Sequence, residues 1–391
     1  MTLIKRITIV SEDYPAKGHQ AYLFVQQLAH SIVHHGIEVT VVAPQSIVHA
    51  VVHRKKLLPS HSVCYTDLGE KYNLYRPYVL SFGRNNFLRK VALWVNKWII
   101  TNKVKGIESD VIYAHFWSCA VPVCDYCSKN DIPLFVACGE GDNALEDMMV
   151  SMSTQKISRL AKAVKGVICV SSENKRKCIE YGLVSEINTI LSPNCVNIHL
   201  FCEKSGNESF RQELGASDED FVVIFVGGFT NRKGPDRVAD AITLLNEKDI
   251  KAIFIGREFS GYEYDFVCPG LIFKGNVEHD MLPRYLNASD VFVLPTQKEG
   301  CCNAIVEALS IGLPVISSKG AFNDDILNDQ NSIRVDPNDI CEIACAIKKL
   351  KCDKALRQRM REYSLGRHED YSIDKRARDI ISFMELKVNN N

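Results

Sequence analysis

The stretch VFVLPTQKEGCCNAIVEALSIGLPVI, residues 291–316, decides the fold class. It begins in DVFVLP (290–295), an apolar β-rich run typical of a buried strand. NAIVEALSI (303–311) then has helical periodicity, with Asn303 as a predicted N-cap and the following Gly-Leu-Pro as the stop. Since LPVISS (313–318) reads as the next strand, the stretch predicts a βαβ unit in a parallel sheet.

The loop QKEGCC places two glutamates near the start of this helix, Glu299 in the loop and Glu307 about a turn into the helix. Glycine lets backbone approach a ligand closely, and the first N–H groups of a helix form an anion site. Carboxylates repel phosphate but accept hydrogen bonds from the hydroxyl groups of a sugar or ribose. We therefore expect a nucleotide-sugar site here. The alternative is a solvated glutamate pair on an ordinary helix.

Two series of β-rich runs alternate with helical patterns along the chain, including a helix predicted over 19–36. Strands are predicted at 4–10, 37–44, 110–115, 132–138 and 166–171, and then at 221–228, 250–256, 271–275, 290–295, 313–318 and 332–335. We predict an α/β fold of two doubly wound Rossmann-like domains facing a central cleft. They comprise 1–197 on the acceptor side and 198–372 on the nucleotide-sugar side, and 373–391 forms a C-terminal helix that packs back on the first.

The composition is that of an ordinary soluble globular protein, with 46% hydrophobic and 24% charged residues among 391. A formal net charge of zero gives no general attraction to nucleic acid. Fifteen cysteines, several of them in apolar runs, indicate reduced thiols in a reducing compartment. The start of the chain lacks a signal-peptide pattern and no apolar run is long enough to span a membrane, so we expect a cytoplasmic protein.

Basic residues concentrate in 51–105, which carries eleven Lys and Arg against only Asp67 and Glu70. Residues 84–105 have helical periodicity, with an apolar face flanked by basic residues: Phe87, Leu88, Val91, Trp94, Val95, Trp98 and Ile99 beside Arg89, Lys90, Lys97 and Lys103. This pattern favours a helix lying on an anionic membrane surface, which would make the protein peripheral on the inner face. The alternative is a core-facing helix with a solvated basic edge.

EGCCNAIVEALSIGLPVI resembles the E-x7-E signature of family-4 retaining glycosyltransferases, and the resemblance extends along the whole chain. FVGGFTNRKGPDRVADAI (225–242) is similar to that family's donor-phosphate loop, and LSPNCVN (191–197) to its interdomain segment. YPAKGHQAYLFVQQLA, which contains Gly18, resembles the glycine loop that faces the donor diphosphate. DVIYAHFW resembles the family's strand that ends in histidine, here His115.

The resemblance implies a GT-B fold and a role for each matched residue. Glu299 would hold donor-sugar hydroxyls, Glu307 the ribose, and Lys233 would neutralise the diphosphate. The residues with an implied catalytic role are Glu299, Lys233, Arg232 and His115. Those implied to bind the donor are Gly18, Gly139, Glu140, Gly227, Gly228, Lys233, Gly275, Gly300, Cys301, Cys302, Asn303 and Glu307.

Two positions depart from the family pattern. Gly228 stands where the family commonly has arginine, and we expect Arg232 either to supply that charge or to be an exposed loop residue. Cys138 stands where the family often has histidine before glycine, and Glu140 or His115 could compensate. For His115 the alternative is a core histidine at a strand end.

No metal site is predicted. Asp218-Glu219-Asp220 matches the D-x-D of metal-dependent enzymes but lies in the linker, where acidic residues usually meet water. Cys124 and Cys127 form a C-x-x-C without a second pair, and buried thiols are the better interpretation.

We therefore expect a metal-independent retaining glycosyltransferase without a cofactor, using a UDP- or GDP-linked sugar donor. The expected acceptor is a glycan, lipid-linked, in cell-surface polysaccharide synthesis. Two alternatives remain open: a nucleotide-sugar epimerase of the same architecture, and a non-catalytic scaffold protein, which Gly228 and Cys138 favour.

Overall fold

The computed structural model of the chain describes residues 3–16, 20–81, 86–141, 143–204, 206, 208–258 and 265–389. The chain forms two compact units. The N-terminal unit comprises Met1–Ser192 together with Asp374–Asn391, and the C-terminal unit is Pro193–Ile373. The polypeptide therefore crosses between the units twice.

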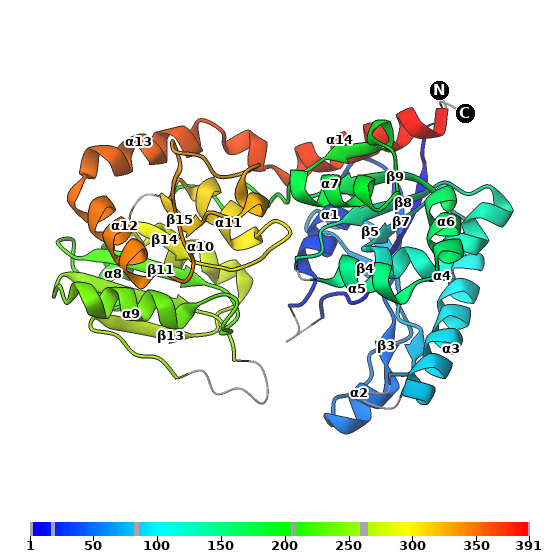
Figure 1. The fold of residues 1–391 in the computed structure, drawn as a ribbon, viewed down its shortest axis with the longest axis horizontal. Helices are drawn as coiled ribbons and strands as arrows, with labels where there is room; N and C mark the ends of the chain where they lie inside the picture. Colours follow the sequence, from blue (N-terminus) through cyan, green and yellow to red (C-terminus); the bar gives the residue numbers. More distant parts are fainter. Residues whose placement is uncertain are drawn as a thin grey trace. The chain divides into compact units, whose positions relative to one another are not determined.

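An eight-stranded sheet forms the centre of the N-terminal unit, in the order β10-β9-β8-β7-β1-β2-β5-β4 (Figure 1). Its strands are β1 (Arg6–Val10), β2 (Glu38–Val42), β4 (His61–Tyr65), β5 (Lys71–Tyr75), β7 (Val111–His115), β8 (Leu134–Cys138), β9 (Val164–Cys169) and β10 (Thr189–Leu191). All neighbouring pairs are parallel except β4 and β5. β7 and β8 are buried along their whole length, as their continuous apolar sequences predict.

Helices connect these strands. They are α1 (Leu23–His34), α2 (Ile47–Val52), α3 (Asn86–Lys105), α4 (Trp117–Asn130), α5 (Ala144–Ser151), α6 (Thr154–Ala163), α7 (Ser172–Glu180) and the 3₁₀ turn η1 (Glu186–Asn188). A short pair, β3 (Gln45–Ser46) with β6 (Tyr78–Val79), lies outside the main sheet. The predicted helix over 19–36 is shorter than expected, because Tyr22 adopts a left-handed conformation at the N-cap and α1 begins after it.

The C-terminal helix α14 (Ile373–Asn389) packs on the N-terminal unit, although it follows the C-terminal unit in sequence. Ser31 Oγ donates to Asp374, and Arg376 Nε donates to Ser192 Oγ at 3.3 Å. Near the chain termini, the backbone N–H of Ile4 donates to Glu385 at 3.2 Å. The N and C labels accordingly lie together in Figure 1.

The C-terminal unit has a six-stranded parallel sheet in the order β13-β12-β11-β14-β15-β16. Its strands are β11 (Phe221–Val226), β12 (Ile250–Ile255), β13 (Leu271–Gly275), β14 (Val291–Leu294), β15 (Val315–Ser318) and β16 (Ser332–Val335). Its helices are α8 (Glu208–Glu213), α9 (Pro235–Leu245), η2 (His279–Met281), α10 (Leu282–Asn287), α11 (Asn303–Ile311), η3 (Ala321–Asn323), α12 (Ile340–Cys352), α13 (Lys354–Leu365) and η4 (His368–Tyr371). Every strand predicted for this half of the chain is present.

The βαβ unit of 291–316 is formed as predicted, by β14, α11 and β15, but its cap differs. Cys302 occupies the N-cap position without a side-chain cap hydrogen bond, and Asn303 is already the first helical residue. The prediction of Asn303 as N-cap was therefore wrong by one residue. Its Oδ1 is buried and makes no hydrogen bond within the described part of the chain. Gly312 ends the helix with φ of 88°, where a Cβ atom would lie 2.9 Å from Leu365 Cγ.

The basic amphipathic segment forms α3, but its apolar residues do not share one environment. Val91, Trp94 and Trp98 are exposed, the two tryptophans to 71% and 60%, whereas Val95 and Ile99 are half-buried. The side chains of Phe87, Arg89 and Lys90 lie outside the described part of the structure. Within the described residues, no helix is both long and apolar enough to cross a membrane.

Candidate active site

Two loops at one edge of the C-terminal sheet bring together the residues of the predicted donor site. One loop follows β11 and carries 227–234, and the other follows β14 and carries 295–302. β11 and β14 are parallel neighbours, paired at Val223–Val291 and Ile224–Phe292. Since the carboxyl ends of parallel neighbours lie at the same edge, the two loops meet there.

Glu299 is the centre of an ion cluster formed by these loops. Its Oε1 lies 2.5 Å from Lys233 Nζ and 2.8 Å from Arg232 Nη1. Thr296 Oγ1 donates to the same oxygen at 2.8 Å. The structure thus brings the three residues with predicted catalytic roles in this unit into direct contact.

The cluster brings two cations, Lys233 and Arg232, to the carboxylate of Glu299. Burial by itself lowers the pKa of Lys233, but the neighbouring Cys302 and Glu299 raise it by more, so this amine is held in its charged form. The Arg232 side chain keeps 37% of its surface exposed, whereas Lys233 and Glu299 keep 14% and 12%. Such a cluster attracts an anion, which would compete with Glu299 for the two cations.

The helix α11 begins beside this cluster. Lys233 Nζ lies 3.7 Å from Cys302 Sγ, which places the lysine at the helix N-terminus. The first turn of α11 contains no acidic residue that would repel an anion. Cys301 and Cys302 are both buried, and the carbonyl oxygen of Cys301 accepts a hydrogen bond from Asn194 Nδ2 at 2.9 Å. The segment 300–303 is therefore held in place from inside the same unit.

The second glutamate of the motif has its own partner. Glu307 is 7% exposed, and its Oε1 lies 3.0 Å from His279 Nε2. His279 belongs to η2 and its ring packs 5.0 Å from that of Phe201. Glu299 and Glu307 are thus held by separate sets of contacts, cationic for the first and imidazole for the second.

The glycines predicted to approach the donor lie at strand ends. Gly227 follows β11, and its N–H donates to the carbonyl oxygen of Ile255 at 2.9 Å. Gly275 is the last residue of β13, and its carbonyl oxygen accepts from Gly256 N–H at 2.9 Å. A Cβ atom on Gly227 would lie 3.6 Å from Lys233 Cδ, an ordinary contact, so packing in the free protein does not by itself require glycine there.

The N-terminal unit holds the remaining predicted residues. His115 ends β7 and is 4% exposed, and burial, with a further contribution from the Arg376 charge, lowers its pKa to about 3. Its Nδ1 has no hydrogen-bond partner among the described residues, and its ring packs against Phe24 and Phe116. His115 is therefore a neutral, buried imidazole.

Glu140 and Gly139 follow the end of β8. The Glu140 carboxylate accepts hydrogen bonds from the N–H of Trp117, the first residue of α4, at 2.9 Å, and from Gly139 N–H at 3.0 Å. Burial raises the pKa of Glu140, and these two hydrogen bonds oppose the rise. Gly18, also predicted to bind the donor, lies outside the described residues.

Cys138, which replaces the family's histidine, faces the protein interior. It is fully buried, with its Sγ 3.3 Å from Cys178 Sγ and 3.6 Å from Asn174 Nδ2. It therefore packs with other groups of the N-terminal unit. This position supplies a thiol to the core where the family pattern has an imidazole.

The metal and thiol motifs occupy structural positions. Asp220 accepts hydrogen bonds from Ser217 N–H and Oγ, both at 2.7 Å, in the turn before β11. Cys124 and Cys127 are buried in the N-terminal core, as predicted. Among the residues that the structure describes, no group of three or more His, Cys, Asp or Glu is arranged to hold a metal ion.

Sequence reasoning missed three residues that shape the site: Thr296, His279 and Arg237. Thr296 and His279 contact the two motif glutamates, and Arg237 reaches back from α9 to the loop that carries Arg232 and Lys233. Thr296 lies only three residues from Glu299, but nothing in the motif marked it as a partner. The contact of His279 with Glu307 spans 28 residues of sequence, so it depends on the fold.

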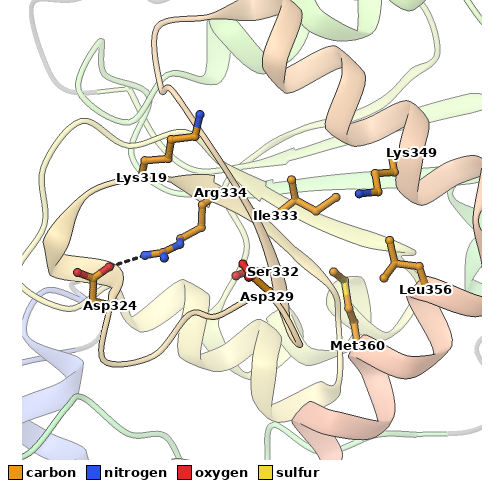
Figure 2. A pocket seen from close by; sticks show the side chains of 9 residues that line it. All are labelled: Lys319, Asp324, Asp329, Ser332, Ile333, Arg334, Lys349, Leu356 and Met360. Atoms are coloured by element: carbon orange, nitrogen blue, oxygen red, sulfur yellow. Dashed lines mark hydrogen bonds and ion pairs between the residues drawn. The ribbon is translucent and has the colours of Figure 1, made fainter.

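A separate hollow of about 540 Å³ lies between β16, α12 and α13 (Figure 2). Lys319, Arg334 and Lys349 line it together with two aspartates and the apolar side chains of Ile333, Leu356 and Met360. Arg334 pairs there with Asp324, as the dashed line in Figure 2 marks. The hollow contains none of the predicted donor residues.

Residues 206–367 match the family described as glycosyl transferases group 1. The C-terminal unit contains a glycosyl transferases group 1 domain. Its match includes the ion cluster of Arg232, Lys233 and Glu299 as well as Glu307. The part of the prediction that names a glycosyltransferase domain is thereby confirmed.

Two curated relatives extend the comparison beyond the group 1 domain. The chain is 28% identical over 207 residues to UDP-Gal:alpha-D-GlcNAc-diphosphoundecaprenol alpha-1,3-galactosyltransferase of Escherichia coli, covering 50% of this chain and 54% of the relative. It is 23% identical over 330 residues to the putative teichuronic acid biosynthesis glycosyltransferase TuaC of Bacillus subtilis, covering 80% of each. The first match thus spans about half of the relative's length.

A solved structure shares the fold of nearly the whole chain. Sucrose-phosphate synthase from Thermosynechococcus elongatus superposes with a TM-score of 0.77 at 15% identity, covering 99% of this chain and all of that one. This likeness concerns the fold alone, and it confirms the predicted GT-B class with two Rossmann-like units.

Proposed function

We propose that this protein is a retaining glycosyltransferase of the E-x7-E type that transfers a sugar from a nucleotide-sugar donor, in the first place a UDP-sugar. The observation that carries the proposal is the convergence of Lys233 and Arg232 on Glu299 at the start of α11. The E. coli relative, whose name specifies a UDP-galactose donor, supports UDP over GDP.

The chemistry of transfer explains the charges. Glycosyl transfer develops an oxocarbenium-like sugar and a departing nucleoside diphosphate. Lys233 and Arg232 would bind the diphosphate and stabilise its growing charge as the glycosidic bond breaks, and the N–H groups of 300–303 would add hydrogen bonds. Loss of one such preorganised contact typically costs about 3–4 kcal/mol of transition-state stabilisation.

The two glutamates would then bind hydroxyl groups of the donor. Glu299, released from its cations by the diphosphate, would accept hydrogen bonds from the sugar. Glu307, oriented by His279, would accept them from the ribose. Gly227, Gly228 and Gly275 would let the donor approach the strand ends. A phosphate oxygen of the donor would take the acceptor's proton, so that no metal and no side-chain base is required.

To the N-terminal unit we assign the acceptor site and part of the contact with the donor sugar. Gly18, His115, Gly139 and Glu140 are the residues proposed there, with His115 acting as a neutral hydrogen-bonding group. The acceptor would be a glycan of a cell-surface polysaccharide, lipid-linked, which the names of the E. coli and B. subtilis relatives support. An acceptor of that kind would place the protein in the cytoplasm and at the inner face of the membrane.

Calorimetric titration tests the donor site directly. UDP, GDP and ADP are titrated without divalent metal into the wild type, Lys233→Ala, Glu307→Ala and the control Lys248→Ala, an exposed lysine of the same unit. We expect micromolar binding of UDP by the wild type and the control. Both site variants should weaken it, Lys233→Ala by on the order of a hundredfold.

A second measurement addresses transfer itself. Hydrolysis of UDP-sugars in the presence of EDTA tests metal independence. The anomeric configuration of the sugar in the transfer product tests retention. Binding of UDP without any turnover, with or without added metal, would favour the scaffold alternative to which Gly228 and Cys138 point. An epimerised sugar released from the donor would favour the epimerase.

A further inference from the structure

We infer that Arg237 is a positioning residue of the diphosphate site, which fixes the loop that carries Arg232 and Lys233 and adds a third, buried positive charge behind it. This inference deepens the proposed function and rests on it. Arg237 lies near the start of α9, immediately after that loop, and is only 7% exposed. A ligand in the site would not touch it directly.

The guanidinium of Arg237 holds both loops of the site. Nη1 donates to the carbonyl oxygen of Asn231 at 2.7 Å and to its side-chain Oδ1 at 3.1 Å. Nη2 donates to the carbonyl oxygen of Pro295 at 2.8 Å, at the end of β14. One side chain thus joins the loop after β11 to the loop after β14, which are the loops that bring Lys233 to Glu299.

The glycine before α9 makes room for this arrangement. Gly234 has φ of 71°, and a Cβ atom there would lie 2.3 Å from Arg237 Nη2 and 2.4 Å from Cζ. Any side chain at 234 would displace the guanidinium from its carbonyl acceptors. Gly234 and Arg237 therefore act together.

The acceptors of Arg237 are all neutral, and no carboxylate pairs with it among the described residues. A buried charge without a counter-charge is costly, so a residue that served only to hold the two loops together would be less costly if it were neutral. Its positive charge instead adds to those of Arg232 and Lys233. The carboxylates that the described structure places near these three cations are those of Glu299 and, in the first turn of α9, Asp236. The resulting field favours a dianionic group such as a diphosphate.

The experiment compares ligands with and without a diphosphate on the full-length protein. Inorganic pyrophosphate, UDP and uridine are titrated into the wild type, Arg237→Gln and Arg237→Lys, with thermal unfolding of each variant recorded in parallel. We expect Arg237→Gln to weaken pyrophosphate and UDP by on the order of tenfold to a hundredfold, with uridine affinity unchanged. Arg237→Lys, which keeps the charge, should recover part of the loss.

A second pair of variants leaves Arg237 in place. Gly234→Ala should weaken pyrophosphate and UDP binding in the same way, because it displaces the guanidinium. Gly215→Ala is the matched control: its φ is 89°, so the substitution is equally strained, but the nearest atom to its Cβ would be 4.0 Å away. The control should lose stability without losing affinity for UDP.

The outcomes separate the inference from the proposed function. If wild-type protein binds neither pyrophosphate nor UDP, the proposed function fails and this inference with it. If it binds both but Arg237→Gln and Gly234→Ala bind as tightly, or lose uridine affinity to the same degree, the inference alone is overturned. Should Arg237→Gln fail to fold, the comparison of Gly234→Ala with Gly215→Ala decides.

Discussion

Glu299 shows at the scale of a single residue how the free protein keeps its cations in place. Lys233 and Arg232 both contact one of its oxygens, so in the absence of an anion the carboxylate serves as their counter-ion. A diphosphate would have to take over these contacts. The same residue would then oppose nucleotide binding and assist transfer, two effects that substitution can separate.

We accordingly predict opposite effects for Glu299→Gln. Removing the competing charge should tighten UDP binding by roughly threefold to tenfold, because Lys233 and Arg232 are no longer neutralised. Sugar transfer should fall by about a hundredfold or more, since the amide is a poorer acceptor for sugar hydroxyls. Calorimetry and a turnover assay on one preparation measure both. Weaker UDP binding by this variant would show that Glu299 organises the cations instead of competing for them.

The burial of His115 predicts how the free energy of unfolding depends on pH. Its folded pKa of about 3 lies below the ordinary value of 6.5, because burial disfavours the charged form. The stability that comes from keeping this imidazole neutral is fully present above pH 6.5 and is lost as the pH falls toward 3. At pH 4 the free energy of unfolding should already be lower by about 3 kcal/mol. His115→Gln, neutral throughout, should flatten the dependence of the unfolding free energy on pH between 6.5 and 4.

Tryptophan fluorescence can follow this transition, because all three tryptophans belong to the N-terminal unit and Trp117 is 1% exposed. Urea unfolding at several pH values compares the variant with the wild type. Parallel curves would mean that His115 is not the group responsible.

At the scale of elements, α3 presents an unusual surface. Leu88, Val91, Trp94 and Trp98 are exposed, and so is Leu93, to 60%, whereas Ala92 and Val104 are buried. Lys97 pairs with Asp125 at 2.6 Å and Lys103 lies 3.6 Å over the Tyr75 ring, so part of the basic edge is used within the protein. The apolar surface is therefore the stronger argument for a membrane contact.

We predict that vesicles containing phosphatidylglycerol bind the protein and shift tryptophan emission to shorter wavelength. The double substitution Trp94→Ala with Trp98→Ala should weaken the partitioning by roughly tenfold, because interfacial tryptophans anchor such helices. Val150→Ala, an exposed apolar residue on α5, is the control. Equal partitioning of all three proteins in co-sedimentation would contradict a role for α3.

The elements also show what the sequence could and could not predict. Strands such as β8 and β14 were predictable because they are continuous apolar runs buried on both faces. The hairpin of β4 and β5 was missed, since alternately exposed residues in a basic segment give a weaker pattern, although Gly69 with φ of 84° marks its turn. At the site, Glu299 and Lys233 were predicted from their motifs. Arg237 was not, because its role depends on where Pro295 lies in the fold.

At the scale of the whole molecule, the division of the chain into units does not follow the order of the sequence. The C-terminal unit is one continuous segment, Pro193–Ile373, whereas the N-terminal unit needs both ends of the chain. On α14 the residues Ala377, Ile380 and Met384 are fully buried. Phe383 lies against the core, with its ring 6.0 Å from that of Phe135 and with no room for a Cβ atom on Gly166.

This arrangement predicts that the two units respond differently to a change in α14. Phe383→Ala should destabilise the N-terminal unit by about 3–5 kcal/mol, because it leaves a cavity beside Phe135 and Gly166. Unfolding followed by tryptophan fluorescence should move to lower temperature accordingly, while the affinity for UDP, which the C-terminal unit supplies in our proposal, should remain.

The isolated segment 193–373 should likewise fold and bind pyrophosphate, whereas 1–192 without α14 should not fold stably. Leu386→Ala, on the exposed side of the same helix, provides the control and should leave the fluorescence transition in place. If Phe383→Ala abolished UDP binding at a temperature where the C-terminal unit is still folded, UDP binding would need the N-terminal unit, and the assignment of the UDP contacts to 193–373 would be wrong.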